Sequence, residues 1–274
     1  MSPGAAPARG RTLVAGERVL LIDRKDRRYL ITLHAGRSFQ SHAGVINHDD
    51  VIGRSEGEEV EARQRDGRVT SAARYLVLRP TLADVVVGMP RGAQVIYPKD
   101  LGAILIAADI FPGAIVLEAG VGSGALSMAM LRAGAVITGY EIRPDFAERA
   151  KANVEAFLGP GQAYCVHERD VYAGISEEGL DRVVLDLPEP WQVVPYAERA
   201  LKAGGILLSY LPTINQTAEL RASLERSEFA MAETFEVLRR TWHIEGRSVR
   251  PDHRMVAHTG FLTSARLLAA RATR

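Results

Sequence analysis

The chain has 274 residues, is 47% hydrophobic and carries a formal net charge of +1 at pH 7. No run of 18 apolar residues occurs, which excludes a membrane-spanning helix, and the single cysteine, Cys165, excludes an intrachain disulfide. The N-terminus lacks the apolar segment of a signal peptide, so we expect a disordered tail over residues 1–16 and a cytoplasmic protein.

The charge is unevenly distributed along the chain. Residues 1–80 hold 14 Lys and Arg against 10 Asp and Glu, and residues 239–274 hold 8 against 2, whereas residues 81–238 hold 12 against 21. Most of the basic residues are arginines, whose planar guanidinium groups suit phosphate. Two interpretations stay open: the basic ends meet in a polyanion-binding face, or they are ordinary solvated surface arginines.

Residues 17–80 have the pattern of a small all-β domain. The expected strands, separated by polar turns, cover residues 18–22, 29–33 and 74–78. The segment 39–48 is expected to be a loop whose histidines, His42 and His48, are structural or contact RNA or another subunit. Two histidines six residues apart without a third ligand make a poor metal site, so no metal is predicted.

From residue 81 onward, strand and helix patterns alternate. Thr81 is expected to cap a helix that runs through Met89, and Pro98 begins one that runs through Ala108. The expected strands then cover 114–118, 135–140, 163–166, 182–186 and 205–210, and the helices between and after them 124–132, 145–157, 191–202 and 215–226. Two last strands, near 231–238 and 255–267, predict a terminal antiparallel hairpin. The alternation predicts an α/β fold with right-handed crossovers and a mostly parallel, Rossmann-like sheet of seven strands.

A glycine-rich turn follows the first strand of this alternation. Because Gly120, Gly122 and Gly124 lack Cβ atoms, backbone N–H groups can approach a ligand closely. Glu141 ends the next strand, seventeen residues after Gly124, at a spacing that suits the two hydroxyls of a ribose. The pair predicts a site for a nucleoside-containing cofactor.

Two features favour S-adenosylmethionine over a dinucleotide, although the glycines fit both. Glu118 precedes the glycines in an E-x-G-x-G-x-G string, the usual form in class I methyltransferases. Asp170 and Asp186 close later strands, where a dinucleotide enzyme needs no acid. The alternative is a glycine-rich turn that binds no ligand.

Further side chains at the C-terminal ends of the strands are expected to face this cofactor. Its methionine end should face the turn and the helix start, at Ser123, Gly124, Ala125 and Leu126. Asp170 has two interpretations, as an acceptor for the adenine amine or as the cap of a turn. Phe146 fits either a cover over the adenine or a place in the core.

Asp186 is the predicted catalytic residue. It begins the string Asp-Leu-Pro-Glu-Pro-Trp, in which two prolines fix the backbone and Trp191 offers a flat apolar surface. The string resembles the acid-Pro-Pro-aromatic slot of enzymes that methylate amino groups of nucleobases. Glu189, within the same string, is expected to be exposed rather than catalytic.

Six strings of the sequence together resemble one family, the tRNA (adenine-58-N1)-methyltransferases, in its actinobacterial form. They are Arg79-Pro-Thr-Leu, Met89-Pro-Arg-Gly-Ala-Gln-Val-Ile-Tyr-Pro-Lys-Asp100, Val116-Leu-Glu-Ala-Gly-Val-Gly-Ser-Gly-Ala-Leu126, Tyr140-Glu-Ile-Arg-Pro144, Leu185-Asp-Leu-Pro-Glu-Pro-Trp191 and His258-Thr-Gly-Phe-Leu262. The resemblance covers roughly residues 17–268, and the second string is its most specific part.

The resemblance implies a class I S-adenosylmethionine-dependent methyltransferase with a small N-terminal all-β domain over residues 17–80 and a Rossmann-like domain over 81–274. It implies methylation of N1 of adenosine 58 in the T loop of tRNA, by a homotetramer whose β domains and neighbouring subunits grip the tRNA. The cofactor contacts of the family map onto residues 123–126 and onto Glu141, Asp170 and Asp186.

The resemblance also implies residues on the substrate side, namely Arg91, Trp191 and His258. N1 of adenine has a free lone pair, so no general base is needed. The enzyme must supply a flipped base and in-line geometry. A carboxylate at Asp186 that accepts from N6–H would stabilise the positive charge that develops on the ring.

The sequence departs from the family at a few positions. Val85 stands where the family usually has a Tyr whose ring helps to position the base, and base stacking is worth on the order of 1–3 kcal/mol. Ala257 replaces a Gly before His258, and Phe146 replaces a polar residue. We therefore expect an intact cofactor site and weaker capture of the base.

Two other functions are considered. A non-catalytic tRNA-binding subunit typically lacks the glycine turn or the motif acid, both of which are present here. A protein carboxyl methyltransferase would need neither the basic ends nor the slot that begins at Asp186.

Overall fold

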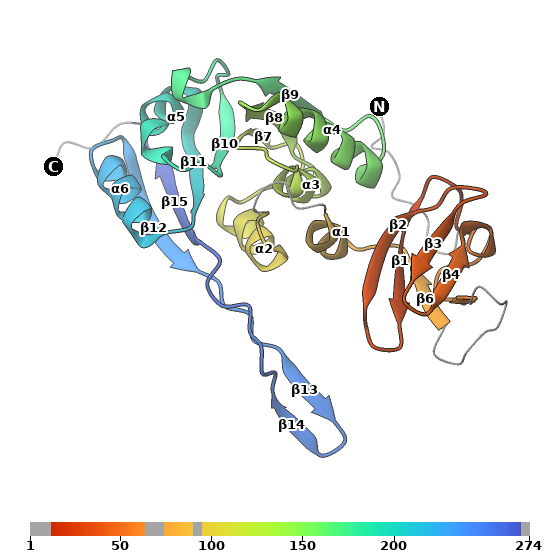
Figure 1. The fold of residues 1–274 in the computed structure, drawn as a ribbon. Coiled ribbons are helices and arrows are strands. Elements are labelled where there is room, and N and C mark those ends of the chain that lie inside the picture. The colour runs from red at the N-terminus through yellow and green to blue at the C-terminus, as the bar shows by residue number, and fades with distance from the viewer. Residues whose placement is uncertain (1–11, 64–73, 90–94, 270–274) are drawn as a thin grey trace. The chain divides into compact units, whose positions relative to one another are not determined.

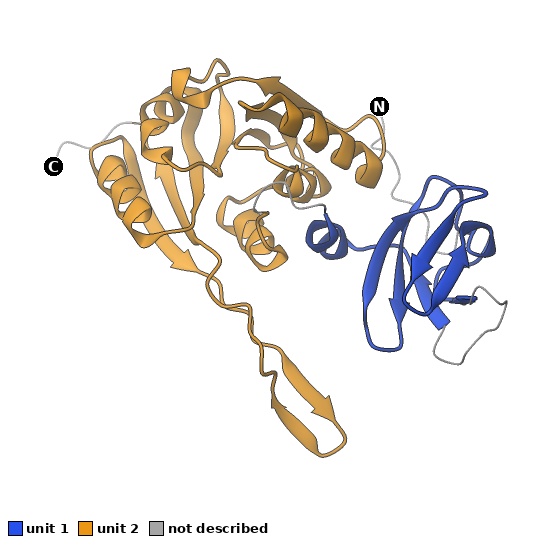
Figure 2. Ribbon diagram, in the orientation of Figure 1, with its two compact units in different colours: residues 1–90 blue, residues 91–274 orange. Residues whose placement is uncertain are grey.

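A computed structural model describes residues 12–63, 74–89 and 95–269. The chain divides into two compact units, residues 1–90 and 91–274 (Figure 2). Helix α1 (Leu82–Gly88) lies in the first of these units, where it contacts strand β2 (Arg28–Thr32). The boundary between the two units, as the contacts define it, therefore lies after α1. The domain boundary expected from the sequence pattern lies before α1, between residues 80 and 81. In the described parts of the chain, no helix is both long and apolar enough to cross a membrane.

The first unit is built on a four-stranded antiparallel sheet. Its order is β2–β1–β6–β5, with β1 at Arg18–Asp23, β6 at Arg74–Leu78 and β5 at Glu59–Glu61. Inward-facing residues such as Val19, Leu21, Tyr75 and Val77 are fully buried and form one core. Thr81 caps α1, as predicted, through a capping box in which its hydroxyl accepts the N–H of Asp84.

The segment predicted as a loop, residues 39–48, instead contains most of a second hairpin. Strands β3 (Ser38–Ser41) and β4 (Gly44–Asn47) pair across a turn that contains His42, and lead into the 3-10 helix η1 (His48–Asp50). The loop prediction is wrong because Phe39 and its cross-strand partner Ile46 join the core of this unit.

His48 has a structural role in this unit. It is buried, and its Nδ1 accepts the N–H of His34 at 2.9 Å. Burial lowers its pKa, which favours the neutral ring that this acceptor role requires. Among the described residues, no group of three or more His, Cys, Asp or Glu is arranged to hold a metal ion.

The second unit contains the predicted seven-stranded sheet, in the order β12–β15–β11–β10–β7–β8–β9 (Figure 1). The strands in chain order are β7 Ile115–Ala119, β8 Val136–Glu141, β9 Tyr164–Glu168, β10 Leu180–Leu185, β11 Leu201–Leu211, β12 Phe229–Glu236 and β15 Phe261–Leu267. Strand β15 pairs antiparallel with both of its neighbours, and the pairs from β11 to β9 are parallel.

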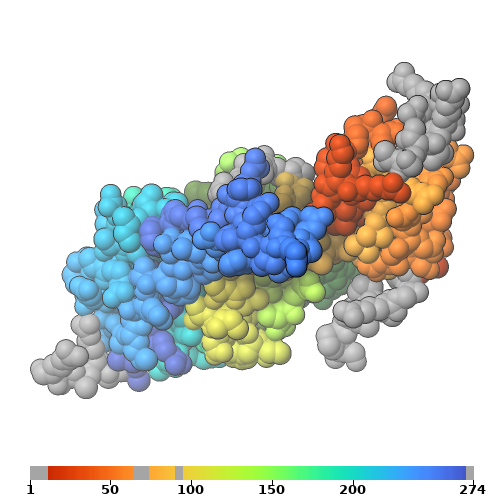
Figure 3. Space-filling model, turned by 90° about the horizontal axis from the view of Figure 1, so that it is seen from below, coloured from red at the N-terminus to blue at the C-terminus, as the bar shows by residue number. Residues whose placement is uncertain are grey.

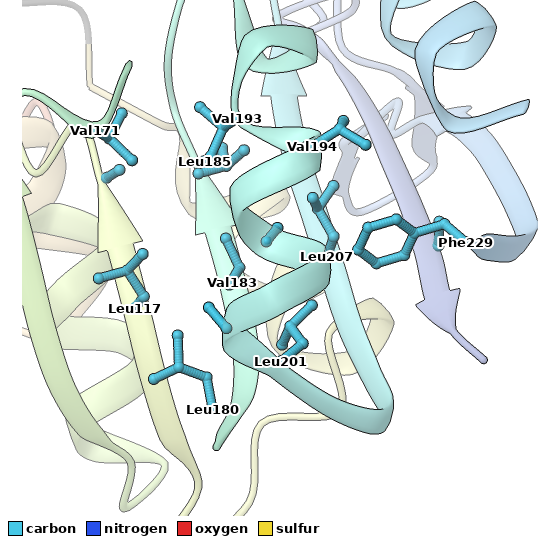
Figure 4. Packing of buried hydrophobic residues seen from close by; sticks show 14 of the residues in the cluster. Leu117, Val171, Leu180, Val183, Leu185, Val193, Val194, Leu201, Leu207 and Phe229 are labelled. Atoms are coloured by element: carbon cyan, nitrogen blue, oxygen red, sulfur yellow. The ribbon is translucent and has the colours of Figure 1, made fainter. Parts of the chain in front are cut away.

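Helices cover this sheet on both faces. They are α2 Pro98–Ala107, α3 Ala125–Arg132, α4 Pro144–Leu158, α5 Val194–Ala200 and α6 Ile214–Glu225. The strand order reverses at β7, so right-handed crossovers place α3 and α4 on one face and α5 and α6 on the other. Figure 4 shows α5 over β10 and β11, where Val183, Val194 and Leu207 pack together.

The helix predicted over residues 191–202 is shorter in the structure. A 3-10 helix, η3 (Pro190–Gln192), precedes α5, which ends at Ala200. Strand β11 begins directly afterwards because Leu201 is buried and pairs with Leu180 of β10. Burial against the sheet thus overrides the helical pattern at this junction.

The predicted terminal pair, β12 with β15, is present and antiparallel. Between these strands the chain forms a further hairpin that the sequence analysis missed, β13 (Trp242–Glu245) and β14 (Ser248–Pro251). We call residues 238–256 the arm; it extends away from the sheet in Figure 1, and its side chains lie on the face seen in Figure 3. Its apolar side chains Trp242, Ile244 and Val249 are 57%, 73% and 60% exposed.

The register of the sheet brings four strand ends together. Ala119 of β7 pairs with Tyr140 of β8 and with Leu185 of β10, and Leu185 pairs with Ser209 of β11. The residues that follow each of these positions therefore meet at one edge of the sheet, where open α/β sheets bind ligands.

Candidate active site

The turn after β7 holds its three glycines in left-handed conformations, with φ of +81° at Gly120, +55° at Gly122 and +81° at Gly124. Packing requires a glycine at the first position and leaves little space at the third. A Cβ at Gly120 would overlap the carbonyl oxygen of Asp186, and a Cβ at Gly124 would lie 3.2 Å from the backbone of Ala150. Only beside Gly122 is the space open, with no atom nearer than 4.0 Å, so this glycine leaves room for a ligand.

Replacing Gly120 by alanine should destabilise the protein more than replacing Gly122. Both substitutions place a Cβ in a left-handed conformation, which costs roughly 1–2 kcal/mol. Only Gly120→Ala also drives the turn against the backbone of Asp186, and such overpacking costs a further 1–3 kcal/mol or so. Urea denaturation of the two variants measures the difference. Equal losses would show that the close approach to Asp186 is not maintained in solution.

Glu141 joins this turn to the end of β8. Its carboxylate accepts the N–H of Gly122 at 2.9 Å through Oε2 and the N–H of Arg143 at 3.0 Å through Oε1. The side chain is only 8% exposed, so backbone donors fix its orientation. Each oxygen retains a further lone pair, which could accept from a vicinal diol.

Glu118, in β7, lies behind the turn and is almost completely buried. Its Oε2 accepts from the hydroxyl of Ser127 at 2.6 Å, and that hydroxyl lies 3.0 Å from the hydroxyl of Tyr164. Its Oε1 is buried without a hydrogen-bond partner among the described residues. Burial raises the pKa of Glu118 to about 8, with smaller contributions from the charges of Asp186 and Glu141. The site thus contains a buried acid that is largely protonated at neutral pH.

Glu118→Gln should therefore change the pH dependence of stability. The pKa of Glu118 is about 8 in the folded chain, against an unperturbed value of 4.5. Between these pH values the unfolded chain loses the proton while the folded chain keeps it, so the free energy of unfolding of the parent falls as pH rises. Glutamine keeps the shape and stays neutral. Urea denaturation should show the variant gaining stability over the parent from about pH 4.5 to 8; a constant difference would contradict the raised pKa.

Asp186, the predicted catalytic residue, is the first residue after β10. Its N–H donates to the carbonyl of Ala119 at 2.9 Å, which holds it against the glycine turn. The residue as a whole keeps some solvent-accessible surface. Burial of its carboxylate, and secondly the charge of Glu141, raise its pKa to about 7. Asp186 can therefore change protonation state within the physiological pH range.

Two aromatic residues are considered with Asp186, namely Trp191, five positions along the chain, and Tyr210, in the neighbouring strand β11. Trp191, in η3, is partly buried, and its carbonyl accepts from the hydroxyl of Ser223 at 3.3 Å. Tyr210, in β11, was not predicted as a site residue; burial raises its pKa to about 12, and the charge of Asp186 contributes. Glu189 is exposed, as predicted, and accepts from the side-chain amide of Gln192 at 2.7 Å.

The two residues with open interpretations occupy different environments. Asp170 is exposed and caps the 3-10 helix η2 (Val171–Ala173), accepting the N–H of Tyr172 at 2.9 Å. Phe146 is 5% exposed on α4, with the guanidinium of Arg143 4.0 Å from its ring centre. For each residue, the structural role is present in the fold, and the cofactor contact stays a prediction.

An apolar residue that the sequence analysis did not select lies next to Glu141. Ile142 is 66% exposed, directly after the carboxylate proposed for the ribose. An isoleucine at the exposed end of a buried strand, following an acid, is the sequence signal that would have identified it. Its side chain is available to cover a flat ring.

The start of α3 faces the same turn. No side chain caps the first N–H groups of α3, whose N-cap is Gly124. Free N–H groups at a helix start favour polar or anionic ligands. Ser123, Ala125 and Leu126 are themselves at most 8% exposed, so contacts there would come mainly from the backbone.

Of the predicted substrate residues, the structure describes Val85 in the first unit and Trp191 and His258 in the second. His258 is exposed, with Nδ1 2.9 Å from a carboxylate oxygen of Glu236 and Nε2 3.0 Å from the carbonyl oxygen of Pro212. These two acceptors raise its pKa. Val85 is fully buried in α1, and Arg91 lies outside the described residues. Contacts of these residues with tRNA stay predictions.

Comparison with known proteins identifies the family. A model described as the tRNA methyltransferase complex GCD14 subunit matches residues 75–251, and a TrmI-like N-terminal model matches residues 12–60. The tRNA (adenine(58)-N(1))-methyltransferase TrmI of Thermus thermophilus is 35% identical over 90% of this chain and 96% of its own length.

Two solved structures agree over nearly the whole chain. One, titled a SAM-dependent O-methyltransferase, from Thermotoga maritima, is 31% identical with a TM-score of 0.87 and covers 96% of this chain and 97% of its own. The other, tRNA (m1A58) methyltransferase TrmI of Aquifex aeolicus, is 29% identical with a TM-score of 0.82 and covers 95% and 100%. Sequence and fold together show that this chain belongs to the tRNA (adenine-58-N1)-methyltransferase family.

Proposed function

We propose that this chain transfers the methyl group of S-adenosylmethionine to N1 of adenosine 58 in the T loop of tRNA. The observation that carries the proposal is a set of carboxylates around one glycine turn. Glu118 lies within β7, Glu141 ends β8 and Asp186 follows β10. Membership in a family whose relatives are named for this activity supports the same assignment.

The residues around the turn fit the cofactor. Glu141 has an ordered carboxylate for the ribose hydroxyls, and the open side of Gly122 leaves room beside it. The unpartnered Oε1 of Glu118 is a buried polar atom that a hydrogen-bonding group on a ligand, or a water, would satisfy. Ile142 and Phe146 would cover the adenine, and Asp170 would accept its amine. When bound, S-adenosylmethionine supplies a methyl group already activated by its sulfonium.

On the substrate side, Asp186 performs the electrostatic part of the reaction. N1 of adenine attacks with its own lone pair, so the protein removes no proton before the attack. As the ring becomes cationic, a carboxylate at Asp186 accepts a hydrogen bond from N6–H and stabilises the new charge. Trp191 offers an apolar surface beside this acid. The remaining contribution is to hold the flipped base in line, with N1 about 3–3.5 Å from the methyl carbon.

The assay is methyl transfer from labelled S-adenosylmethionine to an unmodified tRNA transcript, followed by nucleoside analysis. We expect 1-methyladenosine, which should disappear when adenosine 58 is replaced. Binding of both ligands without transfer would indicate a non-catalytic subunit. Methyl esters on protein, with no binding of tRNA, would indicate a carboxyl methyltransferase.

We further propose that the chain acts in the cytoplasm as a homotetramer that grips tRNA through its basic ends. An isolated two-stranded hairpin is marginally stable in water, so the exposed apolar residues of the arm favour burial against other copies of the chain. Light scattering should give the mass of four chains. A variant with Trp242, Ile244 and Val249 all changed to serine should give a smaller mass, and an unchanged mass would remove the arm from the contact.

A further inference from the structure

A buried charged group joins α2 to the base of the arm. Lys99 and Asp100 have side chains only 5% and 0% exposed. The ammonium of Lys99 donates to Asp100 Oδ1 at 2.7 Å, to the hydroxyl of Thr259 at 2.6 Å and to the carbonyl of Val237 at 2.6 Å. The hydroxyl of Thr259 in turn donates to Asp100 Oδ2 at 2.6 Å. Lys99, Asp100 and Thr259 form a closed ring, which we call the clamp.

The hydrogen-bonding groups of Lys99 and Asp100 all have partners in the clamp and its neighbours. All three protons of the Lys99 ammonium have acceptors, and both oxygens of Asp100 are used. Burying two opposite charges is nevertheless expensive, and apolar residues of similar volume often give equal or greater stability. A role in fixing one arrangement therefore explains this group better than a role in stability alone.

What the clamp fixes is the segment where the arm returns to the sheet. Val237 follows the end of β12, and Thr259 lies just before β15, so both strands at the base of the arm are held. The carbonyl of Thr259 accepts from the hydroxyl of Tyr210 at 2.7 Å. A Cβ at Gly260 would overlap the ring of Tyr210, which shows how closely the two segments pack.

This segment lies near the candidate catalytic acid. Tyr210 is one residue beyond Ser209, which pairs with Leu185, the residue before Asp186. Tyr210 therefore touches the segment held by the clamp, through the Thr259 carbonyl, and belongs to the strand that pairs with the one leading into Asp186. A shift of residues 258–260 would thus be transmitted through Tyr210 to the surroundings of Asp186.

We propose that Lys99, Asp100 and Thr259 are positioning residues that act through Tyr210 to hold the substrate side of the methyl-transfer centre in its reactive geometry. The inference rests on the proposed function. Misplacement of a reacting group by about 1 Å can cost on the order of 10²-fold in rate. Loss of the clamp should therefore lower turnover while the cofactor site, on the other side of β10, stays intact.

The test uses a matched pair at Thr259 in the full-length protein. Thr259→Val keeps the shape and removes the hydroxyl, whereas Thr259→Ser keeps the hydroxyl. We expect Thr259→Val to lower kcat on tRNA by roughly 10- to 100-fold, with an unchanged Kd for S-adenosylmethionine by calorimetry and an unchanged oligomeric mass. Thr259→Ser should stay within about threefold of the parent. Lys99→Met should lower kcat by a similar factor to Thr259→Val.

Hydrogen exchange provides a readout independent of activity. In Thr259→Val, amide exchange should rise in residues 236–238 and 257–260 and stay unchanged in β7 and β8. Unchanged exchange in both segments would overturn the clamp. Raised exchange with a normal kcat, or an equal loss of kcat in Thr259→Ser, would overturn its positioning role. A parent protein inactive on tRNA would instead contradict the proposed function, since the exchange result would still test the clamp.

Discussion

Asp186→Ala is expected to lower the turnover number for tRNA methylation by about 10²- to 10³-fold, the typical cost of removing one group that stabilises charge in a transition state. The effect should fall on turnover because Asp186 meets the base and develops its full interaction only as the ring becomes cationic. The Kd for S-adenosylmethionine should change by less than about tenfold. Single-turnover methylation and calorimetry on the same preparation separate the two quantities.

The raised pKa of Asp186 adds a pH dependence to this prediction. The pKa is about 7 in the ligand-free chain, and kcat/KM reports the titration of free enzyme. Activity requires the ionised carboxylate, so kcat/KM should be high above pH 7 and fall as pH decreases through about 7. Asp186→Asn keeps the shape and one acceptor oxygen, and should lose this inflection. Near-normal turnover of Asp186→Ala would remove Asp186 from the catalytic role.

Glu141→Ala should weaken cofactor binding by about 10²-fold or more. The substitution removes the acceptor proposed for two ribose hydroxyls, and hydrogen bonds to a charged group are worth about 1.5–3 kcal/mol each. It also frees the N–H groups of Gly122 and Arg143, so the turn loses its connection to β8. Calorimetric titration with S-adenosylmethionine measures the loss.

Glu141→Gln serves as the matched control for this prediction. Glutamine retains one carbonyl oxygen for Gly122 or Arg143 but accepts only part of the diol, so an intermediate Kd is expected. Turnover at saturating cofactor should recover in both variants, because Glu141 contacts no reacting atom. An unchanged Kd in Glu141→Ala would show that the ribose lies elsewhere.

The order of elements was predictable because its signals are local. Thr81 with Asp84 caps α1, Pro98 begins α2, and the alternation of strands with helices predicts the seven-stranded sheet that the structure contains. Local signals failed where burial decided the outcome. Phe39 and Ile46 make a hairpin from a polar segment by joining the core, and Leu201 begins a strand where a helix pattern continues.

The sequence by itself determined the family, the sheet and the position of the acids at strand ends, because these depend on motifs and on periodicities of a few residues. Only the tertiary structure decided what those residues meet. Gly120 is required by the backbone of Asp186, 66 positions away, and the pKa of Glu118 is raised because the fold buries its carboxyl group. The clamp joins Lys99 to Thr259, 160 positions away. Desolvation and long-range contacts exist only after the chain has packed, so no local pattern in the sequence predicts them.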